Sequence, residues 1–302
     1  MAQKITLITG CSSGIGLNLA VKLGKDAAKK YLVYSTMRNL DKKGPLQEAA
    51  DSALNDTMFI RPLDVVSDDS VKNAVKEIID EHGRIDIVVN NAGIATFNPI
   101  EYSSIGDIRD VVETNFFGPI RIIQAVLPHM KDQRSGHIVN VSSITGLLGL
   151  PFYETYSASK HAMEGLTEAL AIRMKSFNVK LSSIIPGLVD TEMNSNIVVG
   201  NRLPSKVEVD PLTREQLKIL RTHVTDYFEN TVQTSDEVCE VIQNVIETGQ
   251  QDAAIRFKTS DVVANRTSMK MSDFGGSTWL EFARKMVEDP IMAYLSDDES
   301  QI

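Results

Sequence analysis

Short apolar runs alternate with longer helical patterns along most of this chain. Strands are expected at residues 5–9, 32–35, 58–61, 85–89, 137–141 and 179–185, with a seventh at 253–257. Helical patterns cover residues 15–25, 68–81, 105–130, 154–176 and 214–230. Because helical crossovers join parallel strands, this alternation predicts an α/β fold: one doubly wound parallel sheet of about seven strands with helices on both faces. Pro119, inside the 105–130 pattern, predicts a local kink.

The glycines after the first expected strand predict a dinucleotide site. The residues run Thr9-Gly10-Cys11-Ser12-Ser13-Gly14-Ile15-Gly16, with the glycines spaced G-x3-G-x-G rather than G-x-G-x-x-G. Glycine permits a tight turn, and the N-terminus of the following helix offers N–H groups to a pyrophosphate. An ordinary strand-to-helix turn is the alternative. The position directly after the first strand favours a Rossmann-type dinucleotide site.

The end of the second strand favours NADP over NAD. NAD-binding folds usually place an acidic side chain there for the ribose hydroxyl, whereas this chain has Arg38 and no acid before Asp41. An arginine suits a 2′-phosphate, to which Ser12 can add a hydroxyl. A solvated loop arginine is the alternative. Asp64, after the third strand, can bond the adenine amino group, and a helix N-cap is its competing role.

Tyr156 and Lys160 are the pair with the most specific chemistry. Their spacing of four residues in the 154–176 helix places both side chains on one face. A free tyrosine has a pKa of about 10, and a lysine cation within about 6 Å favours the phenolate and lowers that pKa. Such a pair can carry general acid–base catalysis near neutral pH. On its own, the same spacing also occurs by chance on solvated helix faces.

Charge and cysteine content limit the partners and the compartment. A net charge of −9 over 302 residues argues against nucleic acid, which needs a basic face. Cys11 and Cys239 suggest no disulfide framework and fit a reducing compartment. The N-terminus has no signal-peptide pattern, and the chain has no long apolar run. We therefore expect a cytoplasmic protein with no transmembrane segment.

Several further motifs occur together with this pair and in one order along residues 1–260. They are the glycine-rich turn, Asn90-Asn91-Ala92-Gly93, Asn115, Ser143, Tyr156-Ser157-Ala158-Ser159-Lys160 and Pro186-Gly187. In this combination the chain resembles the short-chain dehydrogenase/reductase family. Segments 36–40, 114–118, 125–131 and 146–152 are most similar to the subgroup of type 1 17β-hydroxysteroid dehydrogenase and the photoreceptor retinol dehydrogenase.

The resemblance implies roles for individual residues. Tyr156 would give or take the proton of the substrate oxygen, Lys160 would lower the pKa of Tyr156 and hold the nicotinamide ribose, and Ser143 would hydrogen-bond the substrate oxygen. Asn115 would join a water-linked proton relay to Lys160. No metal is implied. The residues implied to bind NADPH or NADP+ are Gly10, Ser12, Ser13, Gly14, Ile15, Gly16, Arg38, Asp64, Val65, Asn91, Ala92, Gly93, Tyr156, Lys160, Gly187, Val189 and Thr191.

The substrate is expected to be a small apolar molecule, either a steroid or a retinoid. Besides Ser143 and Tyr156, the expected pocket residues are Leu147, Leu148, Leu150, Pro151, Phe152, Ile197, Val198 and Val199, although core packing explains some of them equally well. His223 falls on the position of a substrate-clamping histidine in the steroid enzyme, with a surface residue as its alternative. The matching carboxylate position falls on Met286, near Glu281 and Glu288, which argues against estrogen specificity.

These expectations define the organisation and the function that we predict. Residues 1–260 form one Rossmann-type domain that includes a substrate lid at 188–232, irregular over 188–211. Residues 261–302 form an extension that packs near the substrate site and ends in a frayed acidic tail. The predicted activity is an NADP(H)-dependent oxidoreductase of steroid, retinol or other lipid metabolism. A catalytically silent NADP(H)-binding sensor or scaffold is the alternative. The resemblance also implies a homodimer formed by the 105–130 and 154–176 helices.

Overall fold

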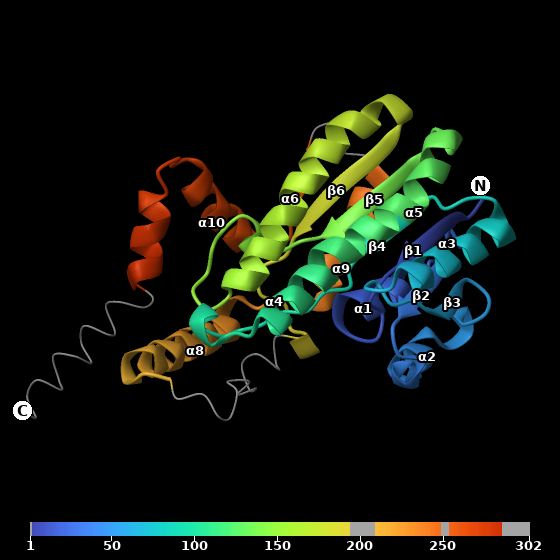
Figure 1. Cartoon of the computed structure of the whole chain (residues 1–302). Coiled ribbons are helices and arrows are strands. Elements are labelled where there is room, and N and C mark those ends of the chain that lie inside the picture. The colour runs from blue at the N-terminus through green and yellow to red at the C-terminus, as the bar shows by residue number, and fades with distance from the viewer. Residues whose placement is uncertain (1, 194–208, 249–253, 286–302) are drawn as a thin grey trace, which may run out of the picture.

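The computed structural model describes residues 2–193, 209–248 and 254–285. Its centre is one parallel sheet with the strand order β3-β2-β1-β4-β5-β6-β7 (Figure 1), which confirms the predicted doubly wound sheet. The strands are β1 Lys4–Ile8, β2 Tyr31–Met37, β3 Met58–Pro62, β4 Ile87–Asn90, β5 Gly136–Val141, β6 Val179–Ile185 and β7 Arg256–Lys258. The strand order reverses between β1 and β4. Ligands of such sheets bind outside the carboxyl ends of the strands at this point.

Helices cover both faces of the sheet. One apolar cluster packs α1, α2 and α9 against one face, and a second packs α3, α5 and α6 against the other. The helices are α1 Gly14–Gly24, α2 Gly44–Ala50, α3 Asp68–His82, α4 Ile105–Val112, α5 Gly118–Gln133, α6 Glu154–Met174, α8 Pro211–Thr231, α9 Ser235–Thr248 and α10 Asp261–Met271. Sequence analysis identified no helix at α2, α9 or α10. The apolar residues of α9 nevertheless recur at helical spacing, as Val238, Ile242 and Val245.

The expected 105–130 helix is interrupted rather than only bent. α4 ends at Val112, a π-helical turn covers Glu113–Phe117, and α5 then begins at Gly118. Pro119 lies in the first turn of α5 and has no N–H to donate to the carbonyl of Asn115. The predicted kink at Pro119 therefore takes the form of a π turn, and this turn carries Asn115 into the interior.

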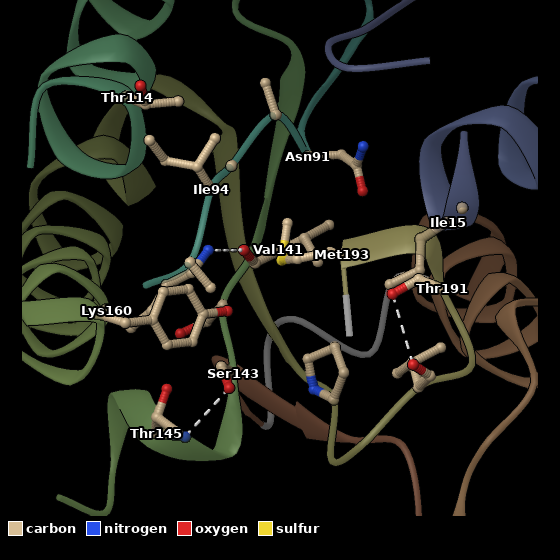
Figure 2. A pocket seen from close by; sticks show the side chains of 18 of the residues that line it. Ile15, Asn91, Ile94, Thr114, Val141, Ser143, Thr145, Lys160, Thr191 and Met193 are labelled. Carbon is tan, nitrogen blue, oxygen red and sulfur yellow. Dashed lines mark hydrogen bonds between the residues drawn. The ribbon is translucent and has the colours of Figure 1, made fainter. Parts of the chain in front are cut away.

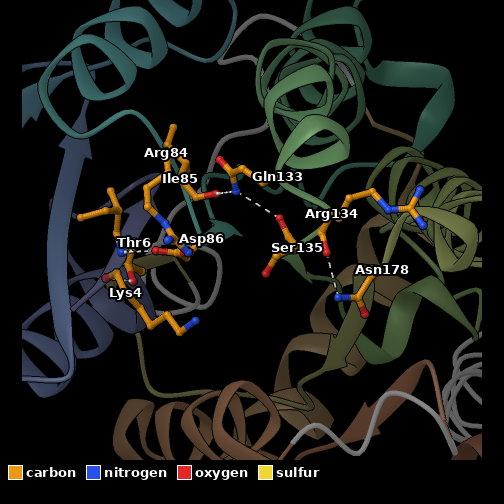
Figure 3. A network of polar contacts seen from close by, with 10 residues as sticks. Lys4, Thr6, Arg84, Ile85, Asp86, Gln133, Arg134, Ser135 and Asn178 are labelled. Carbon is orange, nitrogen blue, oxygen red and sulfur yellow. Dashed lines mark hydrogen bonds and ion pairs between the residues drawn. The ribbon is translucent and has the colours of Figure 1, made fainter. Parts of the chain in front are cut away.

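Asp86 fixes the end of the sheet that is opposite the glycine-rich turn. Its Oδ2 accepts a hydrogen bond from the Ile5 N–H at 2.8 Å, and its Oδ1 accepts one from Arg84 Nε at 2.9 Å (Figure 3). Gln133 Nε2 donates to the carbonyls of Ile85 and Ser135 at 3.2 and 3.1 Å. These bonds join β1, the start of β4 and the α5–β5 turn, so they hold the register of the central strands.

A small apolar cluster attaches α8 to the carboxyl end of the sheet. Leu217 and Leu220 of α8 are buried against Phe97, Phe152 and Tyr153. In Figure 1, α8 and the helical segments after β7 lie beyond the same end of the sheet. Among the described residues, no helix is long and apolar enough to cross a membrane.

Candidate active site

A cavity of about 990 Å³ lies over the carboxyl ends of the strands. Its walls come from the turns that follow β1 to β6, from α4, α6 and α8, and from the segment after β7. Figure 2 shows part of this lining, from Ile15 after β1 to Thr191 after β6. Among the residues expected to bind cofactor or substrate, those lining it are Gly10, Ser12, Ser13, Gly14, Ile15, Arg38, Asp64, Val65, Asn91, Ala92, Gly93, Ser143, Leu148, Leu150, Pro151, Tyr156, Lys160, Gly187, Val189 and Thr191. Gly16 and Asn115 do not line it.

The glycine-rich turn is shaped by close backbone approach. Gly10 has φ +73°, and a Cβ there would lie 2.7 Å from the Cα of Ala92. A Cβ on Gly16 would lie 2.4 Å from the carbonyl oxygen of Gly10 and from Asn91 Nδ2. Both positions therefore require glycine. Gly16, expected to contact the cofactor, packs beneath the turn instead, where it lets Asn91 Nδ2 donate to the carbonyls of Thr9 and Gly10 at 3.0 and 3.1 Å.

The turn leaves hydrogen-bond donors for an anion. Ser13 immediately precedes α1 and makes no side-chain cap, so no side chain of the cap residue occupies the N–H groups of the first turn. An exposed arginine, Arg38, lines the same end of the cavity, and it has no hydrogen bond or ion pair with the described residues. These features fit the pyrophosphate and the 2′-phosphate of a dinucleotide.

Asp64 lines the same end of the cavity but does not cap a helix. Its Oδ1 accepts a hydrogen bond from the Val66 N–H at 3.2 Å. The N-cap of α3 is Ser67, whose Oγ accepts from the Ser70 N–H at 3.3 Å. The competing interpretation of Asp64 as an N-cap is therefore wrong, because the chain makes one further turn between β3 and α3.

Ser143, Tyr156 and Lys160 meet at the other end of the cavity. Lys160 Nζ lies 5.6 Å from the centroid of the Tyr156 ring and donates to the carbonyl of Val141 at 2.9 Å. Ser143 Oγ accepts from the Thr145 N–H at 3.1 Å (Figure 2). Ser142 and Thr145, which also line the cavity, each bury a side-chain hydroxyl that has no hydrogen-bond partner among the described residues.

Burial is the main cause of the pKa shifts of Tyr156 and Lys160. It raises the pKa of Tyr156 to about 12, against a smaller lowering by a hydrogen bond with Ser143. Burial also lowers the pKa of Lys160 to about 8, opposed by the negative charge of Glu164. The expected lowering of the Tyr156 pKa by Lys160 is therefore wrong for this structure. The ammonium lies over the ring and binds the Val141 carbonyl, so desolvation of the phenol outweighs its attraction.

Asn115 lies behind the cavity wall. Its Oδ1 accepts from the Ile94 N–H at 2.9 Å, and its Nδ2 donates to the Ile94 carbonyl at 2.8 Å and to Ser159 Oγ at 3.1 Å. A Cβ on Gly93 would lie 3.2 Å from Asn115 Oδ1 and 3.8 Å from Lys160 Nζ. The structure thus places Asn115 near Lys160, and both polar groups of its side chain brace the strand-end loop that carries Ile94.

The substrate end of the cavity is apolar and partly built by residues that sequence analysis missed. Leu148, Leu150 and Pro151 line it as expected, whereas Leu147 does not and Phe152 packs against Phe97 instead. The further lining residues at this end are Tyr153, Met193, Leu220, Arg266, Trp279 and Phe282. A single tryptophan in the C-terminal part of the chain was the available signal. Its indole N–H donates to the Gly149 carbonyl at 3.2 Å.

Several residues expected to bind substrate do not line the cavity or lie outside the part of the chain that the structure describes. Residues 197–199, Met286 and Glu288 lie outside the described residues, as does the side chain of His223 on α8. Glu281 is exposed, pairs with Lys285 at 3.7 Å and does not line the cavity. Among the described residues, no group of three or more His, Cys, Asp or Glu side chains can hold a metal ion.

Comparison with known proteins relates this geometry to a protein family. Residues 4–201 match the family described as short chain dehydrogenase. Retinol dehydrogenase 8 of Bos taurus is 40% identical over 280 residues, covering 92% of this chain and 88% of that protein. The 17-beta-hydroxysteroid dehydrogenase type 1 of Homo sapiens is 35% identical over 281 residues, covering 93% and 84%. A solved structure of ElxO with NADP bound has a TM-score of 0.71 at 25% identity, covering 87% and 100%.

Proposed function

The chain belongs to the short-chain dehydrogenase/reductase family, and from this premise we propose that it is an NADP(H)-dependent oxidoreductase. It interconverts a hydroxyl and a carbonyl group on an apolar substrate of steroid or retinoid type. The observation that carries the proposal is one continuous cavity with a glycine-rich turn at one end and Ser143, Tyr156 and Lys160 at the other. Its size suits a dinucleotide together with a small substrate.

Each residue of the site has a separate role in the proposed reaction. When bound, the nicotinamide supplies or accepts the hydride. Tyr156 holds a proton on its phenolic oxygen, gives it to the substrate oxygen during reduction and takes it back during oxidation. Ser143 donates a hydrogen bond to the same substrate oxygen and so fixes its position. Lys160 holds the ribose hydroxyls with its ammonium group.

Arg38 supports the choice of NADP. Its guanidinium lines the cavity at the end of β2, where an NAD-binding protein would carry an acid. A guanidinium binds a phosphate by paired, charge-assisted hydrogen bonds. The ElxO structure contains NADP, as its name states, which agrees with this choice.

The apolar end of the cavity supports a steroid or retinoid substrate. Leu148, Leu150, Pro151, Trp279 and Phe282 form walls with few hydrogen-bonding groups. Such walls favour a hydrocarbon skeleton, with Ser143 and Tyr156 left to orient its reacting oxygen. The names of the relatives, a retinol dehydrogenase and a 17-beta-hydroxysteroid dehydrogenase, agree with this chemistry.

Substitution of Tyr156 by phenylalanine tests the proposed function. NADPH consumption is first measured with estrone and with all-trans-retinal. Tyr156→Phe removes only the hydroxyl, so turnover is expected to fall about 10²–10⁴-fold while NADPH binding, followed by fluorescence, is unchanged. Ser143→Ala should behave in the same way, whereas Lys160→Ala should also weaken NADPH binding.

Tyr34→Phe is the matched control for Tyr156→Phe. Tyr34 is also a buried tyrosine, but its hydroxyl binds Glu81 and His82 outside the cavity, so this variant should keep native turnover. Near-native reduction by Tyr156→Phe on every carbonyl substrate that the native protein accepts would show that Tyr156 is not the proton donor.

A further inference from the structure

Glu164 is a buried carboxylate that the proposed mechanism leaves without a role. It lies on α6, one helical turn after Lys160, and is 4% exposed. A buried acid that stays ionised needs charged or hydrogen-bonding partners. Arg256 Nε of β7 donates to one oxygen of Glu164 at 2.7 Å, and the Ser183 hydroxyl of β6 donates to the other. Two strands therefore hold this carboxylate in one orientation.

Lys160 and Glu164 share one packing site over Gly146. Residues four apart on a helix lie on the same face. A Cβ on Gly146 would lie 3.3 Å from Lys160 Cβ and 3.2 Å from Glu164 Cγ. Gly146 ends the short 3-10 turn Ile144–Gly146, which directly follows Ser143. The stems of the lysine and the glutamate therefore lie side by side beneath the turn that carries the substrate-binding serine.

Apart from Tyr156, whose ring lies beneath the Lys160 ammonium, the other titratable groups on α6 and on the elements packed against it are exposed, ion-paired or distant from Lys160. Those groups are Asp107, Arg109 and Asp110 of α4, Glu113 of the π turn, Lys175 of the 3-10 turn after α6 and Lys180 of β6; on α6 itself they are Glu154, His161, Glu168 and Arg173. Glu113 pairs with Arg121, and Lys180 lies at the amino end of β6, away from the cavity. Among these described groups, Glu164 is the buried carboxylate nearest to Lys160 along the helix.

We propose that Glu164 is a positioning residue for the reaction: it supplies the internal negative charge that keeps the Lys160 side chain an ammonium, while Arg256 and Ser183 hold the carboxylate in place. This inference rests on the proposed role of Lys160 in holding the cofactor. It agrees with the balance at Lys160, where burial lowers the pKa and Glu164 raises it. Without the carboxylate, desolvation would act alone and the side chain would lose its proton at lower pH.

Glu164→Gln tests this role because it keeps the size of the side chain and removes its charge. The pKa of Lys160 is measured by NMR of protein labelled with ¹³C at the lysine ε-carbon, with the signal assigned from its loss in Lys160→Met. NADPH consumption and NADPH binding are measured over the same pH range. We expect the pKa of Lys160 to fall by about one pH unit, and the alkaline limbs of NADPH consumption and NADPH binding to move with it. At pH 8, the fraction of Lys160 that is charged should then be about fivefold lower than in the native protein.

Glu168→Gln is the matched control. Glu168 binds the same Arg256 at 2.7 Å, but its side chain is 54% exposed and lies two turns from Lys160. This variant should not change the pKa of Lys160. Glu164→Asp keeps the charge and should restore most of the native profile. If Glu164→Gln folds poorly because Arg256 then keeps only its exposed partner Glu168, the double variant Glu164→Gln/Arg256→Gln removes the pair together. An acid shift smaller than that of Glu164→Gln is expected, because the cation of Arg256 is lost with the carboxylate.

The NMR measurement separates this inference from the proposed function. An unchanged Lys160 titration in Glu164→Gln, with reduced thermal stability, would show that Glu164 only holds β7 against α6 and would overturn the inference. If the pKa of Lys160 falls in Glu164→Gln but the native protein reduces none of the carbonyl compounds tested, the role of Glu164 toward Lys160 is supported. The same result would contradict the proposed oxidoreductase activity.

Discussion

At the scale of single residues, burial decides the chemistry of the catalytic pair. Spacing alone suggests that Lys160 activates Tyr156, because a cation stabilises a phenolate. In the structure, however, the phenol is desolvated, and the ammonium binds the Val141 carbonyl. Tyr156 therefore keeps its proton over a wide pH range, as the proposed role of proton donor requires, and Lys160 is the member of the pair that titrates nearest to physiological pH.

The pH dependence of carbonyl reduction follows from these two groups. Reduction needs Tyr156 protonated and Lys160 charged, and both conditions hold below the lower of the two pKa values, that of Lys160 at about 8. We expect kcat/KM to be constant at lower pH and to fall tenfold per pH unit above an apparent pKa of about 8. Rates measured from neutral to alkaline pH check this. A profile that falls only near the pKa of Tyr156, about 12, would show that the Lys160 charge is not needed.

Arg38 is expected to set the cofactor preference. Arg38→Asp removes a cation from the cavity and repels a phosphate, and losing one charge-assisted contact costs about 1.5–3 kcal/mol. The ratio of kcat/KM for NADPH to that for NADH should therefore fall about tenfold to a hundredfold. Lys42→Asp is the control, because it makes the same charge change on an exposed residue that does not line the cavity. If native protein uses NADH as well as NADPH and Arg38→Asp changes neither, Arg38 is only a loop residue.

At the scale of elements, segments that are remote in sequence complete the substrate end of the cavity. Residues 277–285 are helical and bring Trp279 and Phe282 to the wall. The two rings stack with centroids 5.5 Å apart, and the indole N–H bonds the Gly149 carbonyl. This contact joins the C-terminal segment to the loop before α6.

Trp279→Ala should weaken substrate binding more than cofactor binding. Removing a buried aromatic wall costs about 1.5–3 kcal/mol of apolar contact, so KM for the apolar substrate should rise about tenfold to a hundredfold. The dissociation constant for NADPH should stay the same. Leu280→Ala is the control, because Leu280 is the next residue in the chain but is exposed and does not line the cavity. Equal effects of the two variants would exclude a wall function for Trp279.

At the scale of the whole molecule, we propose a homodimer that uses the exposed faces of α4, the π turn and α6. Ile105, Phe117 and Ile172 expose large apolar side chains on these elements, with Ile172 73% exposed. Pairing with a twofold-related copy would bury them. Light scattering at micromolar concentration should give twice the mass of the chain, and Phe117→Asp should give the mass of one chain. Phe274→Asp, at an exposed phenylalanine outside these elements, should remain dimeric. A native monomer would refute the proposal.

The alternation of apolar and helical segments was enough to predict the fold. Strands such as β2 and β4 are buried on both faces along their whole length, and a parallel sheet covered by helices buries both faces of successive strands in this way. The glycine-rich turn and the Tyr156–Lys160 spacing are likewise local patterns, so the sequence also indicated which residues line the two ends of the cavity.

Only the tertiary structure determined the pKa values of these residues and their long-range contacts. The pKa of Tyr156 depends on desolvation by neighbours that no spacing reveals, and the placement of Gly16 beneath its turn depends on the approach of Asn91. Trp279 meets Gly149, and Arg256 meets Glu164, across long stretches of chain. Sequence patterns report periodicity over a few turns, whereas burial and long-range contacts arise only when the sheet brings distant segments together.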